Sequence, residues 1–152
     1  MTCQTFVDAA CILSSYIQPD QIIRKYYSCR TAVEMECEKI ILEQMKFCFN
    51  NKVAYSFLPK KLHNKVGYGN TDVLVSIPAH ITEVELGITV FEMDNGNFSV
   101  SIRANGFWDS SLLASALGGG EHKSSAGAKV SRYNIIELID LIKQLVEALY
   151  QP

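Results

Sequence analysis

The sequence predicts an α+β fold in which an N-terminal helical segment is followed by a mixed, largely antiparallel sheet flanked by helices. Three observations lead to this prediction. Apolar side chains in residues 1–47 recur at spacings of three and four, as on one face of a helix. From Lys52 onward, short runs alternate between apolar and polar residues, as half-buried strands do. Asp94-Asn95-Gly96 joins two such runs, and Asn-Gly in that position is a strong hairpin signal.

The N-terminal third is predicted to form three helices. The segment 5–13 has apolar residues at i, i+3 and i+4. Pro19 suits the first turn of a second helix, which is expected to continue to Tyr27. Thr31 begins a capping-box pattern, which predicts a third helix over 31–47.

The rest of the chain is predicted to mix strands and helices. Residues 60–70 are rich in Lys, Asn and Gly and indicate an exposed loop, whereas 72–77 fits either a helix or a strand. We therefore expect a helical linker over 1–47 and one domain over 48–152. The predicted strands are 52–58, 84–93, 97–104 and a short run ending at Val130, and the predicted helices are 109–117 and 134–150.

Composition excludes several classes of protein. A hydrophobic fraction of 48% with 20% charged residues excludes a wholly disordered chain. No stretch is apolar for long enough to cross a bilayer, and residues 1–5 lack the pattern of a signal peptide, so no membrane partner is expected. The five cysteines are odd in number and form no Cys-x-x-Cys pair, which favours reduced thiols in the cytoplasm. The formal net charge is −2, so a nucleic-acid partner would need a local basic patch.

The most informative segment is 118–128, Gly-Gly-Gly-Glu-His-Lys-Ser-Ser-Ala-Gly-Ala. Consecutive glycines are costly to order, so they usually mark a positive φ or the close approach of a ligand. Their N–H groups can form an anion-binding concavity, which a following helix N-terminus would strengthen. His122 and Lys123 add side-chain donors. The alternative interpretation is that the glycines only end a helix, with His122 and Lys123 exposed to solvent.

A second polar group precedes this segment. Ser99, Ser101 and Arg103 share one face of a predicted strand because side chains alternate with a period of two. A guanidinium at Arg103 is suited to bidentate contact with phosphate. In isolation, Arg103 is equally suited to a salt bridge at the surface.

Taken together, these motifs resemble a known signature. Ser101-x-Arg103, a short helix and Gly-Gly-Gly-x-His-Lys-x-x-Ala-Gly are similar to the DHH-associated C-terminal domain of DHH-superfamily phosphoesterases. The nearest branch is that of the oligoribonuclease/pAp phosphatases, which includes nanoRNases and exopolyphosphatase-related proteins. The resemblance extends over roughly the whole chain, including the strand pair within 85–105, but only the glycine motif is highly specific.

The resemblance implies a division of labour. In the family, a separate N-terminal domain with an Asp-His-His motif holds two manganese (or magnesium) ions that activate water. The C-terminal domain, which this chain resembles, binds the substrate. No Asp-His-His triplet occurs in this chain and its histidines are scattered, so we expect neither a catalytic residue nor a metal within it. The implied substrate-binding residues are Arg103, Gly118, Gly119, Gly120, His122 and Lys123.

One position departs from the family pattern. Glu121 stands where a fourth glycine is usual. A carboxylate beside a phosphate-binding turn is unfavourable unless it points away or pairs with Lys123 or Arg103. We favour a side chain that points outward.

Three functions are compatible with these observations. The leading hypothesis is the substrate-binding part of a hydrolase that acts on short single-stranded nucleic acid or on pAp, with the Asp-His-His domain as partner. The alternative is a stand-alone nucleic-acid or nucleotide-binding module, aided by a basic loop with an aromatic residue (Lys60, Lys61, His63, Lys65 and Tyr68). The third is an interaction domain that forms a homodimer through the helix at 135–149, although we favour that helix as a cover for the sheet.

Overall fold

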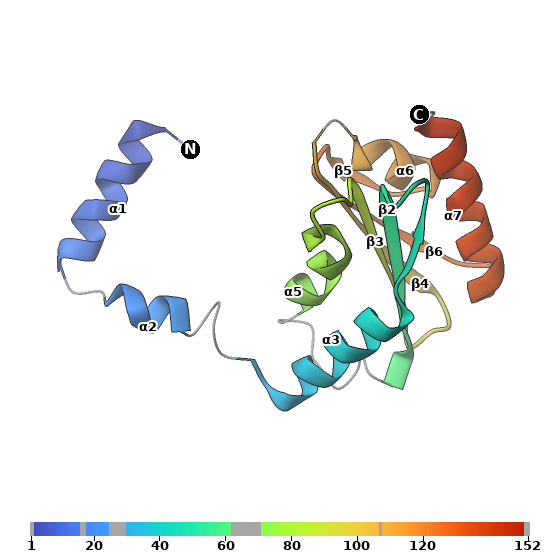
Figure 1. The fold of residues 1–152 in the computed structure, drawn as a ribbon, viewed down its shortest axis with the longest axis horizontal. Coiled ribbons are helices and arrows are strands. Elements are labelled where there is room, and N and C mark those ends of the chain that lie inside the picture. The colour runs from blue at the N-terminus through green and yellow to red at the C-terminus, as the bar shows by residue number, and fades with distance from the viewer. Residues whose placement is uncertain (1, 16–17, 25–29, 62–70, 107, 151–152) are drawn as a thin grey trace. The chain divides into compact units, whose positions relative to one another are not determined.

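The computed structural model describes residues 2–15, 18–24, 30–61, 71–106 and 108–150 (Figure 1). The chain divides into two compact units, Met1–Ala32 and Val33–Pro152. The smaller unit contains α1 (Cys3–Ser15) and α2 (Pro19–Ile23), so a helix over 5–13 and a second one starting at Pro19 are confirmed. The predicted extension of the second helix to Tyr27 lies outside the described residues. None of the helices in the described ranges is long and apolar enough to cross a membrane.

The larger unit is built around one mixed sheet. Its strands lie in the order β1-β2-β3-β4-β6-β5, with β2 and β3 parallel and every other neighbouring pair antiparallel. The α+β prediction is therefore confirmed. The strands are β1 (Lys46–Cys48), β2 (Val53–Leu58), β3 (Leu86–Glu92), β4 (Phe98–Ala104), β5 (Gly120–His122) and β6 (Ser125–Val130); the helices are α3 (Ala32–Gln44), α5 (Thr71–Ser76), the 3-10 helix η2 (Ile77–His80), α6 (Ser110–Ala116) and α7 (Ile135–Leu149).

Several boundaries differ from those expected. The predicted third helix ends at Gln44 instead of Phe47, because the next residues pair with β2 as strand β1. The segment 72–77, which was ambiguous, is helical. The structure groups α3 with the sheet, whereas the sequence placed it in the linker over 1–47, and Cys37 and Ile41 on this helix are fully buried.

One face of the sheet is apolar across its width and packs against α6 and α7 (Figure 1). Asn134 caps α7, since its side chain accepts the Glu137 N–H and the Glu137 carboxylate accepts the Asn134 N–H. Burial of each large apolar side chain on this face stabilises the fold by about 1.5–3 kcal/mol. They include Ile88, Val90, Val100, Ile102 and Val130 from the strands and Leu138, Ile142 and Val146 from α7.

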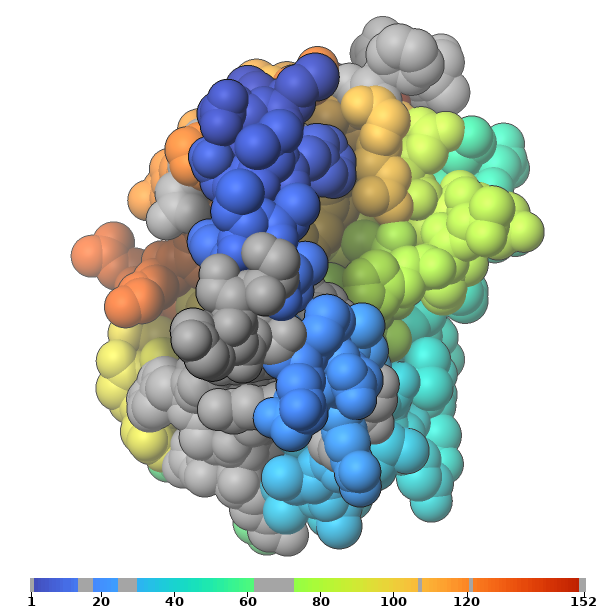
Figure 2. Space-filling view, turned by 90° about the vertical axis from the view of Figure 1, so that its left-hand side faces the viewer, coloured from blue at the N-terminus to red at the C-terminus, as the bar shows by residue number. Residues whose placement is uncertain are grey.

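On the opposite face, the described helices of the larger unit pack mainly over β2 and β3. There, Leu58 and Phe91 pack in a second apolar cluster with residues of α3, α5 and η2. Two buried hydroxyls attach these helices to the sheet: Ser56 donates to the Ile41 carbonyl at 2.9 Å and Thr89 to the Val75 carbonyl at 3.2 Å. Figure 2 shows the outer surface of α5 in yellow-green. Among the described helices of the larger unit, α5 reaches as far as β4 on this face, and neither β4 nor β6 contributes a residue to the apolar cluster.

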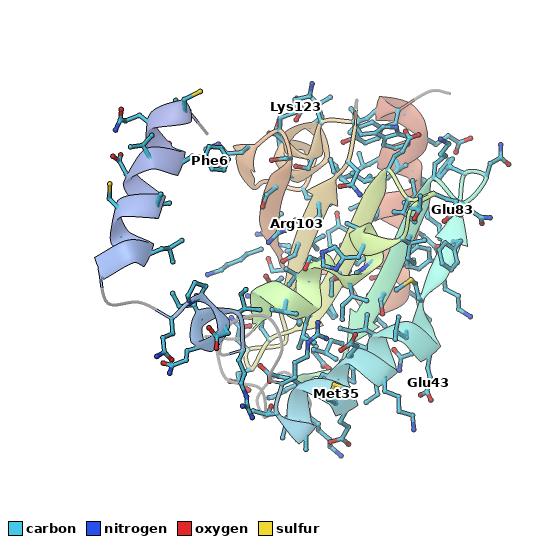
Figure 3. The ribbon with its side chains drawn as sticks, turned by 60° about the vertical axis from the view of Figure 1, so that its left-hand side comes forward. Phe6, Met35, Glu43, Glu83, Arg103 and Lys123 are labelled. Atoms are coloured by element: carbon cyan, nitrogen blue, oxygen red, sulfur yellow. The ribbon has the colours of Figure 1, made fainter. Side chains whose placement is uncertain are left out.

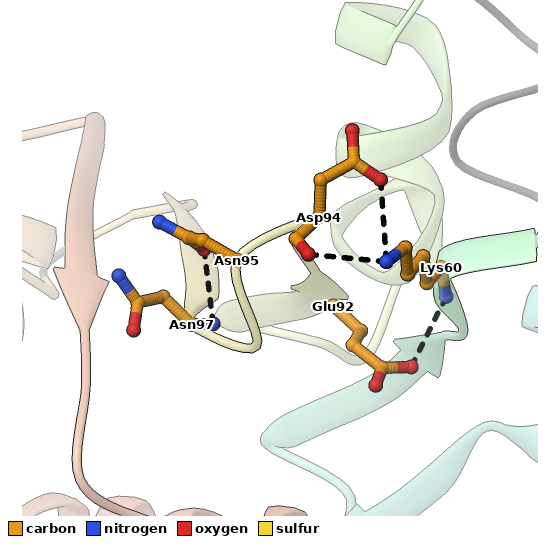
Figure 4. A network of polar contacts seen from close by, with 5 residues as sticks. All are labelled: Lys60, Glu92, Asp94, Asn95 and Asn97. Carbon is orange, nitrogen blue, oxygen red and sulfur yellow. Dashed lines mark hydrogen bonds and ion pairs between the residues drawn. The ribbon is translucent and has the colours of Figure 1, made fainter.

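Lys60 fastens the end of β2 to the β3–β4 hairpin (Figure 4). Its backbone N–H donates to Glu92 Oε2 at 3.2 Å. Its ammonium donates to the Asp94 carbonyl at 3.0 Å and lies 3.5 Å from the Asp94 carboxylate. The hairpin turn is the predicted one, with Gly96 at φ 75° and the Asn97 N–H donating to Asn95 Oδ1 at 3.1 Å.

Gly87 sets how closely η2 approaches the sheet. A Cβ on Gly87 would lie 2.5 Å from the backbone nitrogen of Ala79. We predict that Gly87→Ala lowers the free energy of unfolding by about 1–3 kcal/mol, the usual result of overpacking a core. Urea denaturation measures this change. Glu83→Ala at a nearby exposed position is the control, with an expected effect within about 0.5 kcal/mol; an equal effect of the two substitutions would contradict the close packing.

Candidate anion-binding site

The uncovered half of the sheet carries a polar strip formed by β4 and β6. In the antiparallel register, Ser99 pairs with Lys129, Ser101 with Gly127, and Arg103 with Ser125. Directly paired residues point to the same face, so these six residues lie together. The residues between them on both strands are buried on the α6–α7 face.

A pocket of about 490 Å³ lies over this strip. Gly118 and Gly119, at the end of α6, also contribute to its wall. Among the described residues, the lining contains no carboxylate, three serines and the two cationic residues Arg103 and Lys129. The lining residues are Ser99, Val100, Ser101, Arg103, Gly118, Gly119, Ser125, Ala126, Gly127, Ala128 and Lys129. We call this the β4–β6 pocket.

The polar groups of the pocket have few partners within the described part of the chain. Arg103 donates one N–H to the Ile102 carbonyl at 3.2 Å, and no described carboxylate forms an ion pair with it. The Lys129 ammonium and the three serine hydroxyls form no side-chain hydrogen bond or ion pair with any described residue. A guanidinium has five N–H donors and an ammonium has three. The pocket therefore offers hydrogen-bond donors and positive charge that the described protein groups leave unused.

The glycine triplet begins as the end of helix α6. Gly118 has φ 81°, and its N–H donates to the Ser115 carbonyl at 3.0 Å. The Gly119 N–H donates to the Ala114 carbonyl at 2.8 Å, which completes a Schellman motif. The expectation that these two N–H groups are free for an anion is therefore wrong. The segment that follows is strand β5, so no helix N-terminus adds its dipole there.

Gly119 is required by close packing. A Cβ at this position would collide with the Gly127 carbonyl and lie 2.7 Å from the Ala128 Cα. Gly120 differs, because nothing lies within 4 Å of a Cβ built there. The three glycines thus have different roles: Gly118 ends the helix, Gly119 packs closely against β6, and Gly120 has open space around it.

His122 and Lys123 lie at the β5–β6 hairpin, and both are exposed. Lys123 is labelled in Figure 3. His122 pairs with Ser125, which in turn pairs with Arg103, so the three positions share one face of the sheet. The buried Ser110 holds the hairpin in place by donating its hydroxyl to the carbonyls of His122 and Lys123 at 3.0 and 2.9 Å. Hydroxyl bonds to two carbonyls fix where the hairpin lies relative to α6.

The start of α6 is fixed by Asp109, which is its N-cap. Its carboxylate accepts the Ser111 N–H at 3.0 Å. The hydrogen bond from the Ser111 hydroxyl holds the pKa of the Asp109 carboxyl below its usual range, and the nearby charge of Lys123 lowers the pKa further. The acid is thus ionised and already engaged at the helix N-terminus.

Of the six residues implied by the resemblance, three line the pocket: Arg103, Gly118 and Gly119. Gly120, His122 and Lys123 lie on the adjoining hairpin, outside the lining. The side chain of Glu121 lies outside the described residues, so its orientation stays a prediction. Lys129 was not identified from the sequence. A signal was available, because Lys129 is an even number of residues from Ser125 on a strand whose intervening residues alternate with buried ones.

Other predicted features do not form a site within the described ranges. No group of three His, Cys, Asp or Glu side chains in those ranges is placed to hold a metal ion. In the basic loop, Lys60 is bound to the β3–β4 hairpin, whereas His63, Lys65 and Tyr68 lie outside the described residues.

No protein-family model and no curated protein matches the sequence, but solved structures do match. An exopolyphosphatase-related protein from Bacteroides fragilis superposes with a TM-score of 0.84 at 23% identity, over 97% of this chain and 44% of that one. The fold is shared with phosphoesterase-related proteins. A pGpG-specific phosphodiesterase from Vibrio cholerae matches with a TM-score of 0.56 at 14% identity, over 95% of this chain and 51% of the other. The chain thus spans about half the length of these two proteins.

Two adjacent glycines provide a matched test of the site's construction. We predict that Gly119→Ala lowers the free energy of unfolding by about 1–3 kcal/mol, because its Cβ meets the backbone of β6. Gly120→Ala is expected to change it by less than about 0.5 kcal/mol, since its surroundings are open. Thermal or urea unfolding measures both values, and similar effects at the two positions would contradict this packing.

Proposed function

We propose that this chain binds the phosphate groups of a nucleotide or a short single-stranded nucleic acid in the β4–β6 pocket, as the substrate-binding part of a phosphoesterase. The observation that supports this most strongly is the pocket's donor set. Arg103 and Lys129 line the pocket together with serine hydroxyls, and the described lining residues include no carboxylate. This positive patch lies in a chain whose formal net charge is −2. Local charge of this kind attracts anions that the whole chain would not.

Arg103 is the proposed primary phosphate contact. Its planar guanidinium matches two phosphate oxygens at once, and such charge-assisted bonds are about twice as strong as neutral ones. The hydroxyls of Ser101 and Ser125 flank it on the same face and can donate to the same anion. Gly118 and Gly119 carry no side chains, so a ligand can approach their backbone closely. His122 and Lys123 remain candidates for contacts with ligand parts that extend beyond the pocket.

We propose that water activation belongs to another domain. Two-metal hydrolysis needs side chains that hold the ions, and the described residues include no such group. They do not fit the metal that the resemblance implies, so we assign no catalytic step to them. The proposed partner is an Asp-His-His domain with manganese or magnesium. The superposed structures, which are about twice as long as this chain, are consistent with such a division.

The alternative function is a stand-alone module that binds nucleotide or nucleic acid without catalysis. It predicts the same pocket contacts and differs only in having no hydrolytic partner. For either function we propose a cytoplasmic location. Cys3 and Cys48 are free thiols, which suits a reducing compartment.

Binding should depend on Arg103. We predict saturable binding of pAp and of a labelled dinucleotide at low salt without added metal, measured by calorimetry and fluorescence anisotropy. Arg103→Ala removes a charge-assisted contact of about 1.5–3 kcal/mol, so the Kd should rise roughly 10- to 100-fold.

Lys39→Ala is the control for loss of a positive charge elsewhere. Lys39 is exposed on α3 and pairs with Glu43 at 3.6 Å, so its replacement should leave the Kd nearly unchanged. No binding by the parent chain, or equal binding by the parent chain and Arg103→Ala, would contradict the proposed function.

A separate prediction concerns hydrolysis. This chain, incubated with manganese and pAp, is expected to release no phosphate above the rate in buffer, because the described residues hold no metal-binding group. Colorimetric phosphate detection measures this release. Turnover that depends on manganese and disappears with a chelator would show that the chain carries its own catalytic centre and would contradict the division of labour.

A further inference from the structure

We propose that Lys129 forms a second phosphate subsite, so that the β4–β6 pocket selects ligands in which a ribose separates two phosphate groups. The inference rests on the proposed function, with Arg103 as the first subsite. It adds a specificity-determining residue and a reason why ligands with two phosphates would be preferred over those with one. That class includes pAp, with phosphates on both sides of one ribose, and a 5′-phosphorylated dinucleotide.

The register places the two cations at opposite ends of the polar strip. Arg103 pairs with Ser125, and Lys129 pairs with Ser99, so four residues along β6 separate the two positions. At a rise of about 3.3 Å per residue, this corresponds to roughly 13 Å between the backbone positions. Long side chains can lean toward each other, which shortens the distance between the groups that they bind. The spacing exceeds what a single phosphate spans and suits two phosphates with a sugar between them.

The surroundings of Lys129 distinguish it from an ordinary solvated lysine. Lysines on exposed strands are commonly paired across the strand with a carboxylate. The partner of Lys129 is instead Ser99, and no described carboxylate forms an ion pair with it. Lys129 also lines the same pocket as Arg103. Its charge is therefore uncompensated at a concave surface.

The middle of the strip has room for a sugar. Between the two cations, Ser101 pairs with Gly127, so the central pair consists of a small side chain and no side chain. The neighbouring wall is formed by Gly118 and Gly119. Their N–H groups already donate within the α6 terminus, so the second phosphate must find its donors on side chains. Lys129 is the cation in the lining other than Arg103 that can supply them.

The test compares AMP, which has one phosphate, with pAp and a 5′-phosphorylated dinucleotide, which have two. The parent chain should bind both two-phosphate ligands more tightly than AMP. Lys129→Gln removes the charge and leaves a polar side chain that is one atom shorter. It should raise the Kd for the two-phosphate ligands about threefold to fivefold, as for an exposed ion pair, and leave the Kd for AMP unchanged. Lys129→Arg should restore the preference, and Lys39→Ala should not alter it.

The outcomes separate this inference from the proposed function. If the parent chain binds none of the three ligands, the proposed function itself fails. If it binds them and Lys129→Gln weakens AMP and the two-phosphate ligands equally, or weakens none, the second subsite is wrong while phosphate binding stands. If Lys129→Gln weakens the binding of pAp alone, the second subsite takes a terminal phosphate. If it weakens the binding of both two-phosphate ligands, the subsite takes either a terminal or a bridging phosphate. Circular dichroism and thermal unfolding establish that each variant is folded.

Discussion

The register in which β4 pairs with β6 is the constraint on which both the core and the pocket depend. Side chains on a strand alternate between faces, so Val100 and Ile102 are buried against α6 and α7 while Ser101 and Arg103 face the opposite way. A slip of one residue would expose the apolar set and bury the charged one. The burial of the apolar face therefore fixes which groups reach the pocket, including Lys129.

The sheet face opposite α6 and α7 has an apolar half and a polar half. Over β2 and β3 it is apolar and covered by α3, α5 and η2, which approach closely because Gly87 has no side chain. The side chain of Asn105 donates to the Ala79 and Val84 carbonyls at 2.6 and 3.2 Å, which holds η2 beside the end of β4. Among the described residues of the larger unit, the helical cover ends there, and the polar half beyond it lines the pocket. The pocket is thus a consequence of where the covering helices stop.

Local patterns predicted much of this arrangement. The period of two placed Ser99, Ser101 and Arg103 on one face, and capping patterns located α6 and α7, because these signals lie within a few residues. Strand β1 was missed because Lys46–Cys48 becomes a strand only by pairing with β2, a contact that helical spacing in the sequence does not reveal.

The site itself was predicted only in part, for physical reasons. The sequence placed the end of α6 nearly correctly. It did not reveal that the Gly118 and Gly119 N–H groups are used there, as donors to carbonyls in the last turn of the helix. Lys129 was missed because its place beside Ser99 follows from a register set by the whole sheet. The glycine motif thus located the site, and tertiary pairing determined which groups can bind there.

The central claim is that an anion binds on the open half of the sheet. Amide chemical-shift mapping of the labelled chain during a pAp titration tests it most directly. The account predicts that the largest shifts fall on residues 99–103 and 125–129, which form the polar strip. Shifts concentrated instead on α7, whose Leu138, Ile142 and Val146 pack on the opposite face, would contradict it.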